Sequence, residues 1–325
     1  MKQIALSLGF LGVASTVLVA CAPSQSNSTQ PQANSNSKLQ SVALTVGDLG
    51  NPFFVLMGRG AESEARRIGG EDVRTTIVSS GYDLNLQFNQ MENFIAADTS
   101  LILLNAGDSA GIAPAVAKAK EAGITVIAVD TGAEGGVDAT VTSNNLQAGQ
   151  ISCQYIADRL NGQGNVVIIN GPPVKSVIDR VDGCEQSLAK YPNIKILSKD
   201  QNAEGSRDGG LRVMSDLLTS FGQIDAVFAI NDPTGVGAEL AARQARRNEF
   251  FIVGVDGAPE AKDAIEDPSS VFVATAAQDP LGMTQTAVRV GNDILNGKKP
   301  EDPNILIPVK LITRENVKDY AGWTQ

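Results

Sequence analysis

The sequence predicts an α/β fold of two doubly wound parallel-sheet lobes, joined by a three-strand hinge with a ligand cleft between them. Two observations favour this fold. From Ser41 onward, short runs rich in β-branched residues alternate with amphipathic helical stretches, which is typical of parallel sheets with helices on both faces. The halves also repeat each other, because Asn105 precedes Asp130 by the same interval that separates Asn231 from Asp256. A chain of 325 residues is long enough for two such lobes.

Strands are expected at regular intervals in both halves. In the first half they are residues 42–46, 75–79, 101–104, 126–129 and 139–142. In the second half they are residues 166–169, 194–198, 226–230, 251–255 and 271–276. Helices fill the intervals, for example over residues 110–123 and 206–222, and each of these ends at a Gly suited to a C-cap.

The lobes are predicted to be discontinuous in the chain. The first lobe takes residues 41–143 plus 279–309, because a last helix and strand over 284–311 cross back to complete it. The second lobe takes residues 144–278 plus 310–325. The crossings fall near Ser143, Gln278 and Lys310, and three crossing strands make a hinge that bends without drifting sideways.

The N-terminus has the features of an export signal. Lys2 is followed by an apolar, small-residue run that is too short for a spanning helix, so residues 1–20 are interpreted as a signal peptide. Residues 18–21 resemble a bacterial lipobox, which implies that Cys21 receives lipid; an ordinary signal peptide with an incidental Cys is the alternative. Residues 21–40 are rich in Ser, Asn, Gln and Pro and are expected to form a flexible linker. We therefore expect a periplasmic or cell-surface protein that touches the membrane by a lipid anchor only.

The composition argues against several classes of function. A formal net charge of −10 with no run of Lys or Arg removes the basic surface that nucleic-acid binding requires. The absence of His excludes His-based triads and most catalytic zinc sites. The three cysteines lack the close spacing of metal sites, so neither a metal nor a cofactor is expected. Cys153 and Cys184 lie in neighbouring predicted helices, where we expect free buried thiols, although an oxidising compartment would permit a disulfide.

Ligands of open α/β sheets bind beyond the carboxyl ends of the strands, and this rule selects the candidate binding residues. From the first lobe it selects Asp48, Asn51, Phe53, Phe54, Asn105 and Asp130. From the second lobe it selects the loop around Gly171 to Arg180, then Asn231, Asp232, Asp256 and Gln278.

These side chains suit a polyhydroxylated ring. Carboxylates accept hydrogen bonds from hydroxyls, Arg donates in a fixed fork, and amides do both, while Phe53 and Phe54 cover the C–H faces of the ring. The alternative is that Asn51 and Pro52 form a helix-entry turn and both rings belong to the core. Adjacent residues at a helix start point in different directions, so we expect at least one ring to face the cleft.

The charged candidates also have structural alternatives. Asp130 and Asp256 follow buried strands, where an Asp often caps the next turn, but their matched placement in both halves favours ligand binding. Arg180 lies early in a predicted helix, against the macrodipole, where it gains nothing structurally; this favours a ligand-facing role over a plain surface position.

Several motifs carry a resemblance to a known family. They are NPFF (51–54), VIAVD (126–130), TSNN (142–145), AVFAIND (226–232), VGVDGAPEA (253–261) and VATAAQDP (273–280). With these motifs in this order and spacing, the chain resembles the sugar-binding proteins of ABC transporters in the ribose-binding class, which implies the type I periplasmic binding protein fold. The resemblance implies that sugar is contacted by Asn51, Phe53, Phe54, Asp130, Arg180, Asn231, Asp256 and Gln278.

Four positions depart from the ribose-binding pattern. Gly47 stands in place of Ser, Thr131 in place of Arg, Gly205 in place of an aromatic residue and Val255 in place of Phe. The resemblance therefore implies a roomier site with one Arg less. The segment INDPTGVGA (230–238) is similar to the fructose-binding branch, so a ketose such as fructose ranks beside ribose.

The expected function is capture of a monosaccharide of the ribose or fructose class and its delivery to an ABC transporter permease and its ATPase. The expected protein is a monomer and not an enzyme. One alternative is a sensor for a sugar or for autoinducer-2 that presents its closed form to a chemoreceptor or histidine kinase. Another is a glycosidase that uses Asp130 and Asp256 as its acid and base pair.

Overall fold

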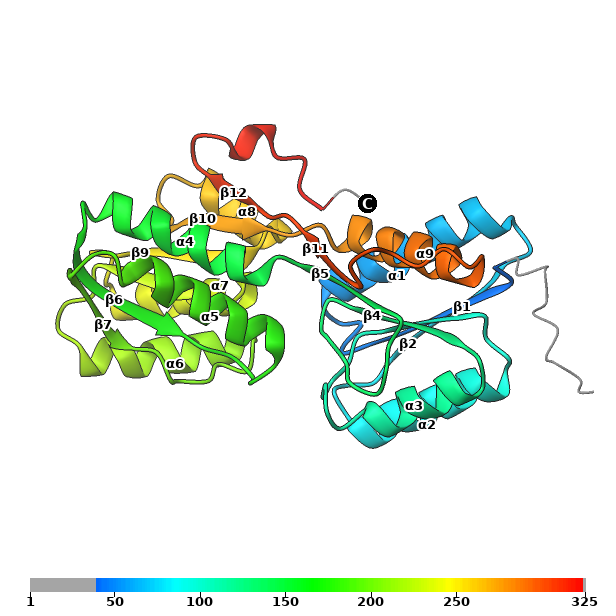
Figure 1. Ribbon diagram of the computed structural model, residues 1–325. Helices are drawn as coiled ribbons and strands as arrows, with labels where there is room; N and C mark the ends of the chain where they lie inside the picture. Colours follow the sequence, from blue (N-terminus) through cyan, green and yellow to red (C-terminus); the bar gives the residue numbers. More distant parts are fainter. Residues whose placement is uncertain (1–38, 324–325) are drawn as a thin grey trace, which may run out of the picture. The chain divides into compact units, whose positions relative to one another are not determined.

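The computed structural model of this chain describes residues 39–323 (Figure 1). The predicted signal peptide, the predicted lipidation site Cys21 and residues 22–38 lie outside the described residues. Two six-stranded sheets form the described part, and their strand orders are β11-β5-β4-β3-β1-β2 and β12-β10-β9-β8-β6-β7. We call each sheet with its covering helices a lobe. The predicted fold class is confirmed.

The first lobe has a wholly parallel sheet. Its strands are β1 (Ser41–Val46), β2 (Arg74–Ser79), β3 (Leu101–Leu104), β4 (Thr125–Val129), β5 (Ala139–Ser143) and β11 (Asn304–Ile307). Every residue of β1, β3 and β4 is buried, as expected for strands covered on both faces. Helices α1 (Pro52–Gly69) and α9 (Pro280–Leu295) run side by side, and α2 (Leu84–Ala96) and α3 (Ala113–Glu121) pack as a second pair (Figure 1).

The second lobe repeats this plan with one difference. Its strands are β6 (Gln163–Ile169), β7 (Asn193–Ser198), β8 (Ala226–Ala229), β9 (Phe251–Asp256), β10 (Phe272–Ala277) and β12 (Lys310–Thr313). The last of these, β12, is antiparallel to β10, whereas its counterpart β11 is parallel to β5.

The helices of the second lobe also pair. Helices α4 (Asn145–Arg159) and α5 (Lys175–Leu188) pack together, as do α6 (Arg207–Ser220) and α7 (Asp232–Ala245). The short helix α8 (Pro259–Glu266) contacts β10 and the 3-10 helix η1 (Val317–Asp319). Each pair contributes its apolar residues to a separate buried cluster, so the sheet has a core on both faces.

A glycine C-cap is expected at the ends of two helices, at Gly123 and at Gly222, and the structure has it at the first only. Gly123 follows α3 with φ 80°, the left-handed conformation expected of a glycine after a helix. In contrast, Phe221, the C-cap residue after α6, has extended backbone, and Gly222 does not adopt the left-handed conformation. Within the described residues the chain passes between the sheets after β5, after β10 and after β11, near the predicted Ser143, Gln278 and Lys310.

The predicted linker is too long at its C-terminal end. Leu39 is 2% exposed and belongs to the apolar cluster of β1 and α1. The backbone carbonyl of Gln40 accepts a hydrogen bond from the N–H of Arg74, which extends the β1–β2 pairing by one residue. Both residues therefore belong to the folded lobe, because Leu39 is a large apolar side chain that the composition argument for residues 21–40 overlooks.

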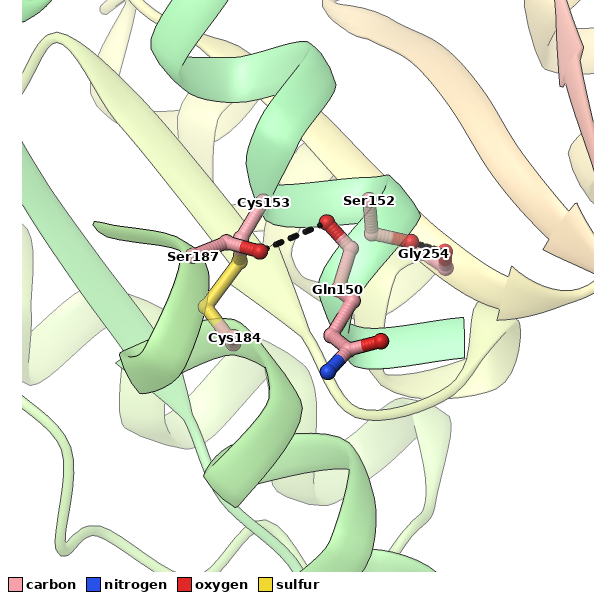
Figure 2. Close-up of a disulfide and its surroundings, with 6 residues drawn as sticks. All are labelled: Gln150, Ser152, Cys153, Cys184, Ser187 and Gly254. Atoms are coloured by element: carbon pink, nitrogen blue, oxygen red, sulfur yellow. Dashed lines mark hydrogen bonds between the residues drawn. A yellow bond between two sulfur atoms is a disulfide. The ribbon is translucent and has the colours of Figure 1, made fainter. Parts of the chain in front are cut away.

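The expectation of free thiols in the second lobe is wrong. Cys153 of α4 and Cys184 of α5 form a disulfide, with Cα atoms 4.9 Å apart and both residues fully buried (Figure 2). The helices approach closely because glycines lie between them: a Cβ on Gly149 or Gly183 would collide with the backbone of the facing helix. Figure 2 also shows the Ser187 hydroxyl donating to the Gln150 carbonyl of α4, at 3.0 Å.

Two further searches cover only residues 39–323. No helix in this range is long and apolar enough to cross a membrane. No group of Cys, Asp and Glu side chains in the same range is arranged to hold a metal ion.

Candidate functional site

A cavity of about 320 Å³ lies at the carboxyl ends of the strands and is lined by residues of both lobes. All the predicted binding residues except Asp48 and Asp232 line it. These are Asn51, Phe53, Phe54, Asn105, Asp130, Arg180, Asn231, Asp256 and Gln278. The rule that places ligands beyond strand carboxyl ends therefore selects one contiguous surface.

The two adjacent phenylalanines are both part of the core and part of the cavity lining. Asn51 caps α1, since its side-chain oxygen accepts from the N–H of Phe53 at 2.9 Å, and Pro52 opens the helix. The rings of Phe53 and Phe54 meet edge to face with centroids 5.5 Å apart, and each residue is about 95% buried. The helix start thus fixes two apolar rings beside the cavity, and each of the two interpretations of these rings holds in part.

The first lobe places one buried carboxylate in the cavity wall. Asp130 follows β4 with φ 67°, is 8% exposed, and accepts from the side-chain amide of Asn105 at 2.9 Å. It caps no helix in the described chain, because its carboxylate points to Asn105 instead. Burial raises the pKa of Asp130 to about 6, against the lowering effect of Arg180.

The second lobe places a matching carboxylate beside a guanidinium. Asp256 ends β9 with φ 134°, is 6% exposed, accepts from the Gln278 side chain at 2.7 Å, and lies 3.6 Å from the Nη1 of Arg180. Burial raises the pKa of Asp256 to about 6, although Arg180 lowers it. A positive φ is energetically costly for an aspartate, and such strain is typical of functional sites.

Asp232 lies beneath the cavity and does not line it. Its carboxylate is fully buried and accepts from the Thr275 hydroxyl at 2.7 Å and from the backbone N–H of Ala258 at 2.8 Å. Burial raises the pKa of Asp232 well above its ordinary value, and the neighbouring charge of Asp256 adds to this effect. We infer that Asp232 supports the floor of the site.

Arg180 has a structural role that the sequence argument does not foresee. Its Nε donates to the side-chain oxygen of Asn145 at 2.8 Å, and its Nη1 donates to the backbone carbonyl of Ile230 at 2.9 Å. The residue is 6% exposed. The guanidinium therefore ties α5 to the start of α4 and to the end of β8, in addition to lining the cavity.

The two amides of the second lobe differ in how they are engaged. Asn231 caps α7 through its side-chain oxygen, which accepts from Thr234 N–H at 3.1 Å, and its amide nitrogen donates to the Gly205 carbonyl at 2.8 Å. The side-chain nitrogen of Gln278 donates a hydrogen bond to Asp256, but its buried Oε1 has no hydrogen-bond partner within the described residues. A buried acceptor without a partner is unusual, and this one belongs to a cavity-lining residue.

The structure places Asp48 outside the cavity lining. Its carboxylate accepts from the backbone N–H of Gly50 at 2.8 Å and so shapes the turn before α1. The lining also contains residues that the sequence analysis does not select, among them Tyr82 and Glu204. Tyr82 follows β2 and Glu204 follows β7, so the same carboxyl-end rule would find both if it were applied to every strand.

The expected extra room at Gly47 is filled. A Cβ built on Gly47 would lie 2.9 Å from the phenol oxygen of Tyr82 and still closer to its ring. The aromatic ring of Tyr82 therefore occupies the space that a side chain at position 47 would take.

Comparison with known proteins gives a consistent result. The family model described as periplasmic binding protein domain matches residues 42–299. The ribose import binding protein of Bacillus subtilis (strain 168) is 32% identical over 300 residues, which cover 92% of this chain and 95% of that protein. A solved ABC transporter solute binding protein from Bacillus halodurans C-125 with bound myo-inositol has a TM-score of 0.79 and 27% identity, and the match covers 88% of this chain and 98% of that one.

A second solved structure belongs to a different kind of protein. It is the fructose binding periplasmic domain of a hybrid two component system, with a TM-score of 0.76 and 26% identity, and the match covers 86% of this chain and 92% of that chain.

Proposed function

This chain belongs to the periplasmic binding protein family, and from that premise we propose that it is an extracytoplasmic solute-binding lipoprotein. It captures one monosaccharide of the ribose or fructose class in the cavity between its lobes and delivers it to an ABC transporter permease and its ATPase. It acts as a monomer, and no covalent step is involved.

The observation that carries this proposal is the unpartnered Oε1 of Gln278. A hydroxyl of a bound sugar would donate to this buried acceptor, which has no partner among the described residues. Asp130 and Asp256 add carboxylate acceptors from opposite lobes, and Arg180 adds a donor. A polyol supplies several hydroxyls that donate and accept, whereas an apolar ligand would leave these groups unsatisfied.

The apolar part of the lining supports the same class of ligand. Phe53 and Phe54 present ring surface from the first lobe, and this surface is suited to the C–H face of a sugar ring. The cavity volume of about 320 Å³ is at the lower end of the range for small-molecule sites. A single monosaccharide therefore fits the chemistry and the scale of the site.

Binding would favour a closed arrangement of the lobes. A ligand shifts a conformational equilibrium only if it binds one state better than the other. Contacts from Asp130 in one lobe and from Asp256 in the other can be made together only when both surround the ligand. The permease would then recognise the closed form. We do not propose the sensor alternative, because the similar protein of Bacillus subtilis, whose match covers 92% of this chain, is named a ribose import binding protein.

The proposed location follows from the N-terminal sequence, which lies outside the described residues. Cleavage before Cys21 and lipidation of its thiol would anchor the protein, and residues 22–38 would connect the anchor to the folded part that includes Leu39. The anchor can be tested by detergent phase partitioning of protein expressed in a bacterium that processes lipoproteins. The wild type should enter the detergent phase, whereas a Cys21→Ser variant should enter the aqueous phase. Retention of the wild-type partitioning by this variant would contradict the lipid anchor.

The sugar-binding proposal is tested by the melting temperature of the purified full chain with D-ribose, D-fructose, myo-inositol or autoinducer-2. At a hundredfold excess over the dissociation constant, a ligand that binds only the native state stabilises it by about 2.7 kcal/mol. We expect Gln278→Leu to reduce this shift, and Gln223→Leu, at an exposed glutamine outside the cavity lining, to leave it unchanged. No shift with any of these compounds would contradict the proposed ligand class.

A further inference from the structure

Tyr82 combines features that a core residue does not have. It lines the cavity, yet 60% of its surface is exposed. It follows Gly81 in the loop after β2, and both residues adopt left-handed backbone, with φ 59° and 58°. This conformation is unfavourable for a residue with a Cβ. The loop therefore holds a large aromatic side chain in a strained backbone without burying it in the core.

The ring of Tyr82 extends the aromatic surface of the first lobe. Its centroid lies 6.4 Å from that of Phe54, with an interplanar angle of 70°. Phe54 in turn meets Phe53 edge to face. The second lobe contributes no aromatic ring to the cavity lining within the described residues. All aromatic contacts to a ligand in this cavity would therefore come from Phe53, Phe54 and Tyr82.

The Tyr82 ring can occupy this position only because residue 47 is a glycine. Any side chain at position 47 would meet the phenol end of Tyr82, since a Cβ there would lie 2.9 Å from the phenol oxygen. The backbone N–H of Gly47 donates to Asn105, which also holds Asp130, so the phenol lies close to the carboxylate side of the cavity.

The hydroxyl of Tyr82 is available as a donor. It makes no hydrogen bond to any residue between 39 and 323. Although much of the residue is exposed, burial, together with the negative charges of Asp130, Asp48 and Asp256, raises the pKa of Tyr82 to about 12. The phenol therefore keeps its proton at neutral pH.

We propose that Tyr82 is a specificity-determining residue of the sugar site: its ring packs against a C–H face of the ligand beside Phe54, and its hydroxyl donates to a ligand oxygen near Asp130. This inference rests on the proposed function. The ring of Tyr82 occupies the space that a side chain at position 47 would take. Gly47 and Tyr82 together would therefore determine which sugars bind.

The first experiment measures dissociation constants of the full chain by calorimetry, using whichever of D-ribose, D-fructose and myo-inositol binds the wild type most tightly. We expect Tyr82→Ala to weaken binding about tenfold, and Tyr82→Phe, which removes one hydrogen bond, to weaken it about fivefold. The order of preference among the three sugars should also change in Tyr82→Ala. Leu86→Ala, at an exposed residue of α2 outside the lining, is the matched control and should bind as the wild type does.

The second experiment tests the coupling between positions 47 and 82. A single methyl in Gly47→Ala adds no hydrogen-bonding group but must displace the Tyr82 ring, so it should weaken binding severalfold. In the Tyr82→Ala background the same methyl meets no ring, and the further loss should be less than about twofold. Equal losses in both backgrounds would contradict the proposal that the ring position determines affinity.

The outcomes separate this inference from the proposed function. If the wild type binds none of the three sugars, the proposed function fails. If the wild type binds but Tyr82→Ala and Tyr82→Phe keep both its affinity and its order of preference, the role of Tyr82 is overturned. Because the ring is largely exposed, the ligand-free melting temperature of these variants should stay close to that of the wild type. A large fall in that temperature with unchanged affinity would mark Tyr82 as purely structural.

Discussion

The two lobes share one strand order but divide the chemistry of the site between them. In both lobes an aspartate lies at the carboxyl end of the fourth strand in chain order and receives a hydrogen bond from a side-chain amide, Asn105 for Asp130 and Gln278 for Asp256. Both aspartates have a positive φ. The pKa of each is raised, and burial is the main cause in both cases. The backbone plan therefore produces the same carboxylate twice.

The difference lies in what surrounds each carboxylate. The first lobe contributes the rings of Phe53, Phe54 and Tyr82, whereas the second contributes Arg180. The second lobe is also cross-linked by its disulfide, and the sequence has no cysteine in the described part of the first lobe. One lobe thus supplies the apolar face of the site and the other its cation. A repeated fold fixes where side chains meet a ligand but leaves their chemistry free to differ.

The largest effect on stability and on sugar binding is expected from replacing Arg180, the arginine that the second lobe contributes to the cavity lining. Arg180→Ala should lower the free energy of unfolding by about 3 to 5 kcal/mol, because it leaves the buried carboxylate of Asp256 without its ion-pair partner and removes the donor to Asn145 and to the Ile230 carbonyl. It should also abolish the sugar-induced shift in melting temperature. Urea unfolding of the ligand-free chain measures the first effect. Arg207→Ala, at an exposed arginine of α6, is the control and should change neither quantity.

The disulfide gives the next largest effect and is confined to the second lobe. Replacing both cysteines with alanine should lower the free energy of unfolding by about 3 kcal/mol, since the bond closes a loop with a sequence separation of 31. The paired control, Ser152→Ala with Ser187→Ala in the same helices, should cost less. Hydrogen exchange should increase more in α4 and α5 than in α1 and α9. A uniform increase in both lobes would contradict a local role for the bond.

The smallest effect concerns the matched carboxylates. The folded-state pKa of Asp130, about 6, exceeds the ordinary value of 3.8, so the folded chain takes up the proton more readily. The resulting stabilisation is fully present below pH 3.8 and is lost as the pH rises through about 6. For the ligand-free chain it should amount to about 1 kcal/mol at pH 5 relative to pH 7.5.

Thermal unfolding at these two pH values checks this prediction. Asp130→Asn should remove that part of the pH dependence, and Asp256→Asn should remove a contribution of the same sign, because the pKa of Asp256 is also about 6. If only one of the two variants changed the slope, the two lobes would not be electrostatically equivalent at this position.

Much of the fold could be predicted because parallel strands that are covered on both faces must be apolar along their length. The buried runs of β3 and β4 show this pattern directly in the sequence. The disulfide could not be predicted, because the distance between Cys153 and Cys184 depends on how closely α4 and α5 pack. The burial of Leu39 could not be predicted for a related reason: a single apolar residue in a polar segment shows no periodicity.

The site divides in the same way. The sequence by itself determined that acids, amides and rings follow the strand ends, because strand direction fixes the edge at which parallel strands finish. Only the tertiary structure decided that Asp48 closes a turn, that Tyr82 fills the space beside Gly47, and that Arg180 holds the protein as well as facing the cavity. These outcomes depend on distances between segments far apart in the chain, and local residue patterns carry no information about those distances.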